Sequence, residues 1–412
     1  MKQVRARSVP PMQGPGRRAT ALVARSSLEL GRGILVTFVT MLLLSGCGSH
    51  DAVTGATLTP PEDISELDDA EAPGAGFLAP ALLSIVTYEG SGQLVHPDAA
   101  VFPDRWQGKR YWISGTPYPS GNPSYENPSI FQGRHSNEMR VPVGVANPIV
   151  AAPKSGYMSD PDILYDADSD ALRMYYRYTS GEADQIFVTS SQNGVAWSPA
   201  QLVISDLRYS LISPSIVRES ATSWRMWTVN ATAQGCYSLR TELTLQQRHS
   251  TDGMTWGAPE IVTLHVPGRV PWHWDVQYVA AKAEYWALVA AYPEGTSCSQ
   301  TTVYFARSAD GTTWKVSPTP LLAANEVEAL RDLVYRSSFH YHEGSDAVSV
   351  WFSGAHREGR GFVYAVASAR YPYADLMRRV GGSTPAILER EGAASISPEL
   401  REARSRFEAD FP

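Results

Sequence analysis

One unit of about 60 residues recurs along this chain, and it limits the folds that the chain can adopt. Its clearest element is a tight turn before a tryptophan, found in the segments STDGMTW (250–256) and SADGTTW (308–314) and, more loosely, SQNGVAW (191–197). The glycines of successive turns lie 59 and 58 residues apart. Asp-Gly or Asn-Gly between β-rich flanks is typical of a β-hairpin, because both residues adopt positive φ.

A second recurring element is a polar corner that runs into an apolar strand. Its five copies begin at His96, Asp160, Ser213, His273 and Arg336, with spacings of 64, 53, 60 and 63 residues. An aromatic-rich strand follows each corner, and further strands flank each turn. Four antiparallel strands repeated five times predict an all-β fold, a five-bladed β-propeller. The alternative is an array of β-sandwiches, whose strands do not repeat at a fixed period near 60.

The composition agrees with a large β-rich fold. Hydrophobic residues make up 43% of the chain, which excludes a wholly disordered protein. The chain has 20 Tyr, 11 Trp, 32 Gly and 29 Pro, and only 19% of its residues are charged. These residues favour strands and turns over long solvated helices. The residues after 47 include 28 Lys/Arg and 41 Asp/Glu, a net charge of −13, which argues against nucleic acid as a partner because phosphate binding requires cationic patches.

The N-terminal segment has the features of a secretion signal. Residues 1–47 hold seven Lys/Arg and one acid, and the apolar run 34–44 has the length of a signal-peptide core. The following Leu44-Ser45-Gly46-Cys47 resembles a bacterial lipobox. This resemblance implies that Cys47 is acylated and that the protein is lipid-anchored in the bacterial cell envelope, outside the cytoplasm. An ordinary buried helix that ends at a chance cysteine is the alternative.

Three further boundaries follow from composition and pattern. Residues 48–78 are acidic, include Pro60-Pro61, and predict a disordered tether. We place the propeller at 79–372. The tail, 373–412, contains Ser397-Pro398-Glu399, which combines an N-cap, a first-turn proline and an early acid. It predicts a short helix that packs on the outside.

Propeller geometry brings the five corners together at one end of the central axis, which we call the mouth. The first ring there comprises His96, Asp160, Ser213, His273 and Arg336. A second ring, two residues farther along each strand, comprises Asp98, Asp162, Ser215, Asp275 and Ser338. The loops around the mouth contribute Tyr118, Tyr125, Glu126, Tyr237, His356 and Arg357. Acids, aromatic rings and an arginine suit a sugar ligand. Alternatively, these residues only cap strand ends, as Asp and Ser often do.

The segments Thr116-Pro117-Tyr118-Pro119, 125–130 and 147–149, with the repeat, resemble the five-bladed propeller glycosidases of the arabinanase, xylosidase and invertase type. The resemblance covers about residues 92–372 and includes an uncharacterised bacterial branch. It implies an Asp base on blade one, a pKa-tuning Asp on blade two and a Glu acid on blade three.

This sequence provides some of the expected catalytic residues but not all of them. Asp98 is the candidate base, and Asp160 or Asp162 the candidate modulator. The third-blade acid position holds Ile212, so whether the chain is an enzyme stays open. Glu126, Glu242 or Asp275 could supply the acid instead.

The sequence is therefore compatible with three candidate functions. The first is a membrane-anchored glycoside hydrolase that acts on an extracellular or periplasmic glycan. The residues expected to bind its substrate are His96, Tyr118, Tyr125, Ser213, His273, Arg336, His356 and Arg357. The second is a lectin-like protein that binds a carbohydrate without cleaving it, which the empty acid position favours. The third is a propeller that binds a protein partner.

The remaining candidate groups concern cysteine and metal chemistry. Cys236 and Cys298 occupy equivalent loops of adjacent blades, and a disulfide is plausible outside the cytoplasm; two separate thiols are the alternative. No cofactor is expected. The resemblance implies a channel calcium near His340 and His342 as a weaker alternative to two core histidines.

Overall fold

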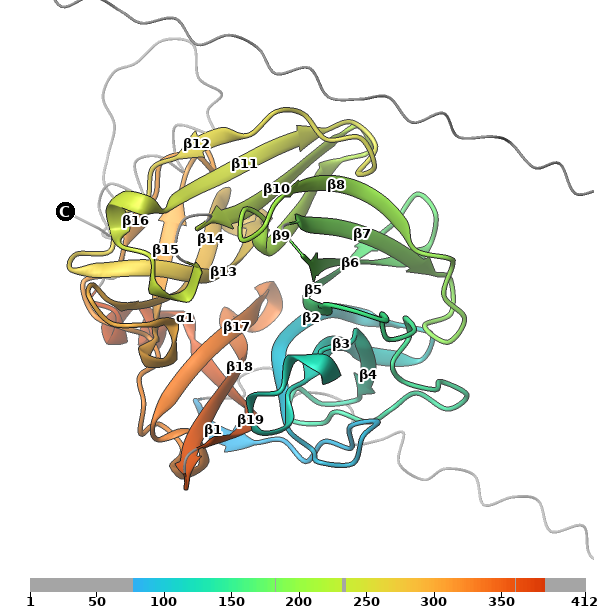
Figure 1. Ribbon diagram of the computed structural model, residues 1–412, viewed down its shortest axis with the longest axis horizontal. Helices are drawn as coiled ribbons and strands as arrows, with labels where there is room; N and C mark the ends of the chain where they lie inside the picture. The colour runs from blue at the N-terminus through green and yellow to red at the C-terminus, as the bar shows by residue number, and fades with distance from the viewer. Residues whose placement is uncertain (1–76, 182, 232–234, 360, 382–412) are drawn as a thin grey trace, which may run out of the picture. The chain divides into compact units, whose positions relative to one another are not determined.

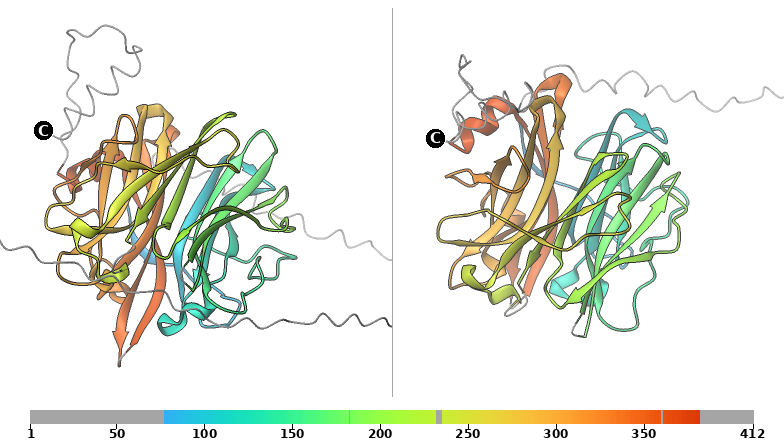
Figure 2. Two further views of the ribbon diagram at one scale, coloured as in Figure 1. Left: turned by 45° about the horizontal axis from the view of Figure 1, so that its top comes forward. Right: turned by 90° about the horizontal axis from the view of Figure 1, so that it is seen from above.

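The computed structural model describes residues 77–181, 183–231, 235–359 and 361–381. These residues form five antiparallel sheets and one short α-helix. Figure 1 shows the sheets as blades around a central axis, which confirms the predicted five-bladed propeller. Figure 2 shows the same blades from two further directions.

In blades one to four, the strands run in chain order from the axis outward. Blade one contains β2 (Leu94–Trp106), β3 (Lys109–Pro117) and β4 (Ser129–Gly133). Blade two contains β5 (Tyr157–Asp166), β6 (Ala171–Ser180), β7 (Ala183–Ser191) and β8 (Gln201–Leu207). Blade three contains β9 (Ile212–Ser220), β10 (Ser223–Asn230), β11 (Thr244–Ser250) and β12 (Glu260–Val262). Blade four contains β13 (Arg269–Val279), β14 (Glu284–Pro293), β15 (Thr302–Ser308) and β16 (Lys315–Val316).

Blade five joins the two ends of the described chain. Its inner three strands are β17 (Leu333–His342), β18 (Ala347–Glu358) and β19 (Gly361–Pro372), and its outer strand is β1 (Leu78–Leu82). The strand β1 precedes the first repeat and pairs antiparallel with β19, with Leu78 opposite Arg370. This pairing closes the ring of blades, so the fold includes Leu78, one residue before the predicted boundary.

Blade one differs from the predicted four strands. Its sheet has three strands, and the place of the fourth is taken by an isolated bridge between Gln132 and Arg140. Short 3₁₀ helices lie in the connections: η2 (Pro119–Gly121), η3 (Pro123–Tyr125), η4 (Gly235–Tyr237), η5 (Arg240–Glu242), η6 (Ala280–Lys282), η7 (Cys298–Gln300), η8 (Glu328–Leu330) and η9 (Glu343–Ser345).

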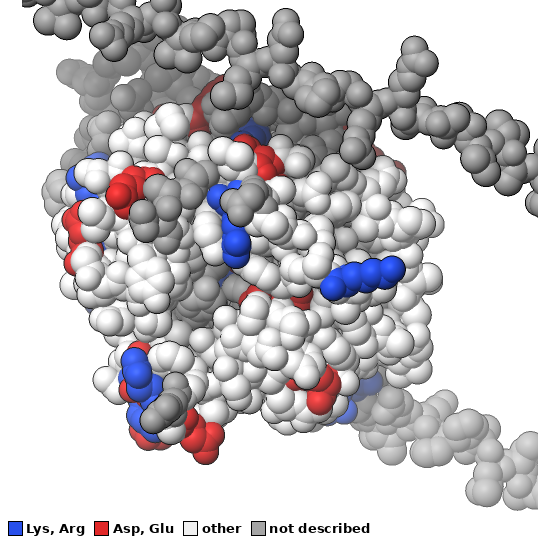
Figure 3. Space-filling model, viewed as in Figure 1, with Lys and Arg blue, Asp and Glu red and all other residues white. Residues whose placement is uncertain are grey.

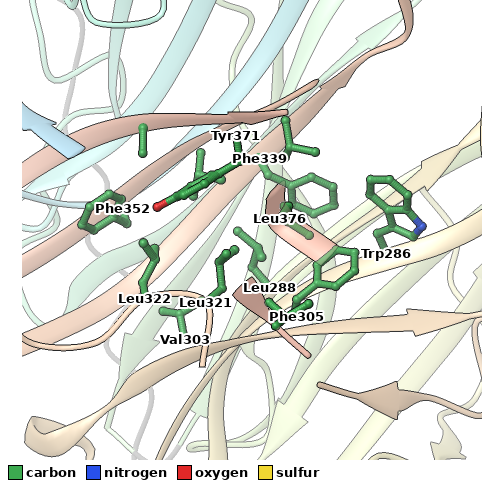
Figure 4. Close-up of a cluster of buried hydrophobic side chains, with 14 of the residues drawn as sticks. Trp286, Leu288, Val303, Phe305, Leu321, Leu322, Phe339, Phe352, Tyr371 and Leu376 are labelled. Atoms are coloured by element: carbon green, nitrogen blue, oxygen red, sulfur yellow. The ribbon is translucent and has the colours of Figure 1, made fainter. Parts of the chain in front are cut away.

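The helix α1 (Tyr373–Arg379) packs against blades four and five. Tyr373 stacks on Trp286 with ring centroids 5.3 Å apart, and Leu376 reaches the apolar cluster shown in Figure 4. The helix predicted at 397–399, the signal segment with Cys47 and most of the tether lie outside the described residues. Within the described ranges, no helix is both long and apolar enough to cross a membrane.

The turns that contain Gly194 and Gly311 pack against tryptophan side chains of the preceding blade. Gly194 has a φ of 70°, and a Cβ built on it would lie 2.1 Å from the Trp112 ring of blade one. Gly311 repeats this contact, since Trp227 of the preceding blade donates an indole hydrogen bond to its carbonyl. Trp314 donates to the same carbonyl from within the turn. Glycine is required here for both its φ and its lack of a side chain.

Candidate functional site

Every inner strand carries a β-bulge at its polar corner. The pairing register between the first and second strands shifts there in all five blades. Three of the corner residues have positive φ: His96 (55°), Asp160 (52°) and Ser213 (52°). A bulge changes the direction of a side chain, and positive φ in a residue with a side chain is unfavourable and concentrates at functional sites. The backbone thus turns these corners toward the axis.

Asp160 is the centre of the group of side chains that results. Its Oδ1 lies 3.5 Å from His96 Nε2, 3.3 Å from His273 Nδ1 and 3.5 Å from Arg336 Nη1. Its Oδ2 lies 3.1 Å from Arg177 Nε. Burial raises the pKa of Asp160, but His96, Arg177, His273 and Arg336 together outweigh burial and hold this pKa well below its ordinary value. Asp160 is therefore an ionised, fully buried carboxylate.

The two imidazoles beside Asp160 are neutral at pH 7. Burial lowers the pKa of His96 to about 4, and it lowers the pKa of His273 well below its ordinary value, against the attraction of Asp160. His96 Nδ1 lies 3.0 Å from Thr116 Oγ1. Among the described residues, His96 Nε2 and both ring nitrogens of His273 have no hydrogen-bond partner. Buried polar atoms are nearly always paired, so these nitrogens indicate a ligand.

Glu126 is the acidic group nearest to this centre on the blade-one loop. It is 5% exposed, and its Oε1 lies 3.9 Å from His96 Nδ1. Burial raises the pKa of Glu126 well above its ordinary value, and the charge of Asp160 adds to the effect. The pKa values of the two neighbouring carboxyls are thus shifted in opposite directions, that of Glu126 upward and that of Asp160 downward, which is typical of an acid–base site.

Tyrosine rings surround the histidines and Glu126. The Tyr335 ring centroid lies 4.5 Å from that of His273 and 5.5 Å from that of His96. Tyr118 packs on Tyr364 with centroids 4.9 Å apart. Burial raises the pKa of Tyr364 to about 12, and the charge of Glu126 adds to it. Phenol rings of this kind offer a sugar both an apolar face and a hydroxyl group.

The second predicted ring forms a deeper group on the axis. Asp98, Asp162 and Asp275 are 2–3% exposed, and one carboxylate oxygen of each lies within 4.8 Å of the others. Burial raises the pKa of Asp98 to about 6 and that of Asp275 to about 8, and it raises the pKa of Asp162 well above its ordinary value. These carboxyls face one another rather than Asp160.

The other predicted mouth residues have different partners. Ser213 Oγ donates to the Trp274 carbonyl and accepts from the Trp274 N–H, so it joins blades three and four. Tyr125 is 39% exposed, and its carbonyl accepts from the Tyr88 hydroxyl. Its ring remains available at the rim.

On blade five, His356 Nδ1 lies 3.1 Å from the Ala329 carbonyl oxygen. The Arg357 N–H donates to Asp332, and its guanidinium lies over the Phe362 ring. These contacts place both residues on the rim rather than at Asp160.

Cys236 and Cys298 form a disulfide, the first of the two states considered from the sequence. It joins η4 to η7, and Tyr292 reinforces the link by donating to the Ser238 carbonyl. The neighbouring Tyr237 is 69% exposed.

His342 contacts Ser349, and its ring packs against His340 4.9 Å away. Both histidines lie toward the far end of the inner strand from the Arg336 corner.

Sequence reasoning missed Arg177 and Tyr335. Arg177 lies on β6 and could have been noticed as a cation between tyrosines in the segment YYRY (175–178). Tyr335 directly precedes the corner residue Arg336. Ile212, at the expected acid position, is fully buried in the core of blades three and four.

The arrangement can hold a metal ion and move protons. Two neutral imidazoles and one carboxylate offer ligand atoms within 4.8 Å of one another. That donor set suits zinc and other divalent transition metals. Glu126 and Tyr335, next to the histidines, supply an acid–base group and a hydroxyl.

Comparison with known proteins points to carbohydrate-active relatives. An A-type blood N-acetyl-α-D-galactosamine deacetylase of Flavonifractor plautii is 29% identical over 313 residues. The match covers 65% of this chain and 40% of the relative, so this chain spans only about 40% of the relative's length. No family model matches the chain.

Solved structures agree with the fold. The crystal structure of an N-acetylgalactosamine deacetylase from F. plautii, in complex with blood group B trisaccharide, has a TM-score of 0.68 and 25% identity. The alignment covers 73% of this chain and 97% of the chain of the F. plautii structure. A glycoside hydrolase with a TM-score of 0.50 is 12% identical over 72% of this chain and 92% of its own, which shows the fold alone. Family-43 and family-62 glycoside hydrolases and an arabinanase are also structural neighbours.

Proposed function

We propose that this protein deacetylates a glycan: it hydrolyses the acetamido group of an N-acetylhexosamine and leaves the glycosidic bond intact. The observation that carries the proposal is the convergence of two buried neutral histidines, with unpartnered ring nitrogens, on ionised Asp160. The F. plautii relative, named as a deacetylase of N-acetyl-α-D-galactosamine, supports it.

His96, Asp160 and His273 would hold a divalent transition metal. When bound, such an ion supplies Lewis acidity toward a carbonyl oxygen and lowers the pKa of a coordinated water. Arg177 and Arg336 keep Asp160 ionised and fix its orientation through their contacts with its two oxygens.

The protein's own groups supply the proton transfers. Glu126 accepts a proton as water adds to the amide carbon, and returns it to the nitrogen as the C–N bond breaks. The products are acetate and a free amino sugar. Trp272 Nε1 donates to the Tyr335 hydroxyl oxygen, 3.3 Å away, which leaves the phenolic hydrogen to donate to the substrate carbonyl.

Glycoside hydrolysis is the less favoured chemistry here. It requires two carboxyls that flank a glycosidic bond. Blade three supplies Ile212 instead of an acid, and Asp98 lies in the deeper group with Asp162 and Asp275. Charged side chains on the molecular face shown in Figure 3 are sparse and of both signs, which suits a neutral glycan ligand.

Replacing Glu126 by glutamine is expected to lower the kcat for acetate release by on the order of 10²–10⁴-fold, because the proton carrier is lost. Glycans that end in α-N-acetylgalactosamine or N-acetylglucosamine are the substrates, and acetate and new reducing ends are measured in parallel. Glu328→Gln, an exposed carboxyl on η8, is the matched control and should keep full activity.

Two outcomes would replace the proposal. New reducing ends without acetate would identify a glycosidase. Tight binding of the glycan with neither product would identify a lectin-like protein.

We also propose that the protein acts at the bacterial cell envelope through an acylated Cys47, on the support of the sequence 34–47 alone. Cys47→Ser should move the protein from the membrane fraction to the soluble fraction of cells. Unchanged membrane association in this variant would contradict the anchor.

A further inference from the structure

A hollow of about 570 Å³ lies between blades two and three, away from Asp160. It is bounded by the start of β6, the end of β7, the turn 191–198 that connects β7 to β8, and Met254 in the corresponding turn of blade three. Arg173 in its wall comes four residues before Arg177 on β6, about 13 Å along the strand from the residue that contacts Asp160. The volume is in the range that small-molecule ligands occupy. No residue of its lining has a part in the proposed deacetylation.

Hydrogen bonds within the turn hold one wall of the hollow in shape. Asn193 Oδ1 accepts from the backbone N–H groups of Val195 and Ala196, each 2.9 Å away. The Ser198 N–H donates to the Ser190 carbonyl, and Ser198 Oγ accepts from the Ser190 N–H, 3.0 Å away. A wall that is ordered before a ligand arrives lowers the entropic cost of binding.

The opposite wall is fixed across the junction of the two blades. Arg173 Nη1 donates to the Asp252 carbonyl in the blade-three turn, 3.0 Å away and close to Met254 in sequence. Arg173 Nη2 lies 2.7 Å from Asp166 Oδ2, and the guanidinium lies over the Trp224 ring. Among the described residues that line the hollow, Arg173 is the only charged one, and Asp166 balances it. The hollow therefore favours an uncharged ligand.

Trp197 contributes an indole N–H that has no partner. Its Nε1 is buried and makes no hydrogen bond to any described residue. The equivalent Trp314 of blade four does make one, because its Nε1 donates to the Gly311 carbonyl, 3.1 Å away. Trp256, in the corresponding turn of blade three, also lacks a partner for its Nε1, but it does not line the hollow. A buried, unpaired N–H is unfavourable, so a ligand oxygen at Trp197 would be stabilising.

We propose that this hollow binds one neutral sugar residue of a glycan without cleaving it. The ring of Trp197 offers an apolar surface to the C–H face of a sugar, and its N–H offers a donor. Hydroxyl and amide groups suit the sugar hydroxyls, and the lining supplies them from side chains that are at least partly exposed, namely Ser190, Gln192, Ser198 and Gln201. Binding here does not depend on the proposed deacetylation.

Methyl NMR on the whole protein, with isotope-labelled methionine methyl groups, tests the site. Met254 lines the hollow, and its signal is identified by its absence in Met254→Leu. The methyl glycosides of galactose, glucose and mannose are the probes, because they carry no acetamido group and are not substrates of the proposed deacetylation. At least one of them, at millimolar concentration, should shift the Met254 signal in a saturable way. No saturable shift with any of the three would overturn the proposal in favour of a hollow that holds only water.

Variants identify the groups that bind the sugar. Trp197→Ala should abolish the shift of the Met254 signal. Trp197→Phe, which keeps an aromatic ring and removes the indole N–H, should weaken binding by about tenfold. Trp256→Phe, the same change outside the hollow, should bind as the wild type does. If Trp197→Ala does not fold, Trp197→Phe decides: unchanged affinity in that variant, or equal weakening in Trp256→Phe, would overturn the site.

Discussion

Replacing His273 by alanine is expected to lower kcat/KM for acetate release by on the order of 10³-fold, with little loss of fold. The variant removes one of the two neutral imidazoles at Asp160 but leaves the contacts of Asp160 with Arg177 and Arg336 intact. No buried charge loses its partner. Steady-state acetate release and thermal unfolding, measured on the same preparation, check both parts.

Asp160→Asn is the informative companion variant. It should lose activity to the same extent, but it should also lower stability. Buried Arg336 loses the carboxylate that balances it, and Arg177 keeps only Asp184, whose Oδ2 lies 3.6 Å from its Nη1. His265→Ala, an exposed histidine beyond β12, is the control for His273→Ala. Activity of His273→Ala within a few-fold of wild type would contradict the role of the imidazole.

Replacing Arg307 by methionine is expected to lower the free energy of unfolding by about 3–5 kcal/mol. Arg307 is 1% exposed and reaches both carboxylate oxygens of fully buried Glu284, with Nε 2.7 Å from Oε2. Trp286 donates to the same carboxylate oxygen. Without Arg307, the charge of Glu284 stays buried without its cation. Denaturant unfolding curves measure the loss.

A surface ion pair is the matched control. Arg331 and Glu328 lie 3.1 Å apart, but their side chains are 38% and 87% exposed. Arg331→Met should therefore cost less than about 1 kcal/mol. The double variant Arg307→Met/Glu284→Leu should recover much of the stability, since both charges leave together. Equal losses in Arg307→Met and Arg331→Met would show that burial does not set the strength of these pairs.

The propeller could be predicted because its signals are local. The Asp-Gly turn at 252–253 and the corner at Asp160-Pro161 are each formed by a few neighbouring residues. The interval at which such motifs recur gives the length of one blade. Closure by β1 could not be predicted in this way. Leu78 pairs with Arg370 across most of the chain, and nothing in the segment 78–82 identifies its partner. The bridge that replaces a fourth strand in blade one is likewise a tertiary outcome.

The candidate site was predictable in position but not in chemistry. Equivalence of the five corners brought His96, Asp160 and His273 to one axis. Period-two alternation placed Asp98, Asp162 and Asp275 on the same side as the corners, but the bulges at the corners alter that alternation.

As a result, the carboxyls separate into a group centred on Asp160 and a group that contains Asp98. That separation, and the neutrality of the two imidazoles, depend on burial and on distances of about 3–4 Å that spacing in the sequence does not reveal.

Mass spectrometry of a defined glycan with a terminal N-acetylhexosamine, after incubation with the purified protein, tests the proposed chemistry most directly. Deacetylation predicts an intact oligosaccharide that is lighter by one acetyl group and carries a free amine. Release of the terminal sugar with its acetyl group still attached would contradict it.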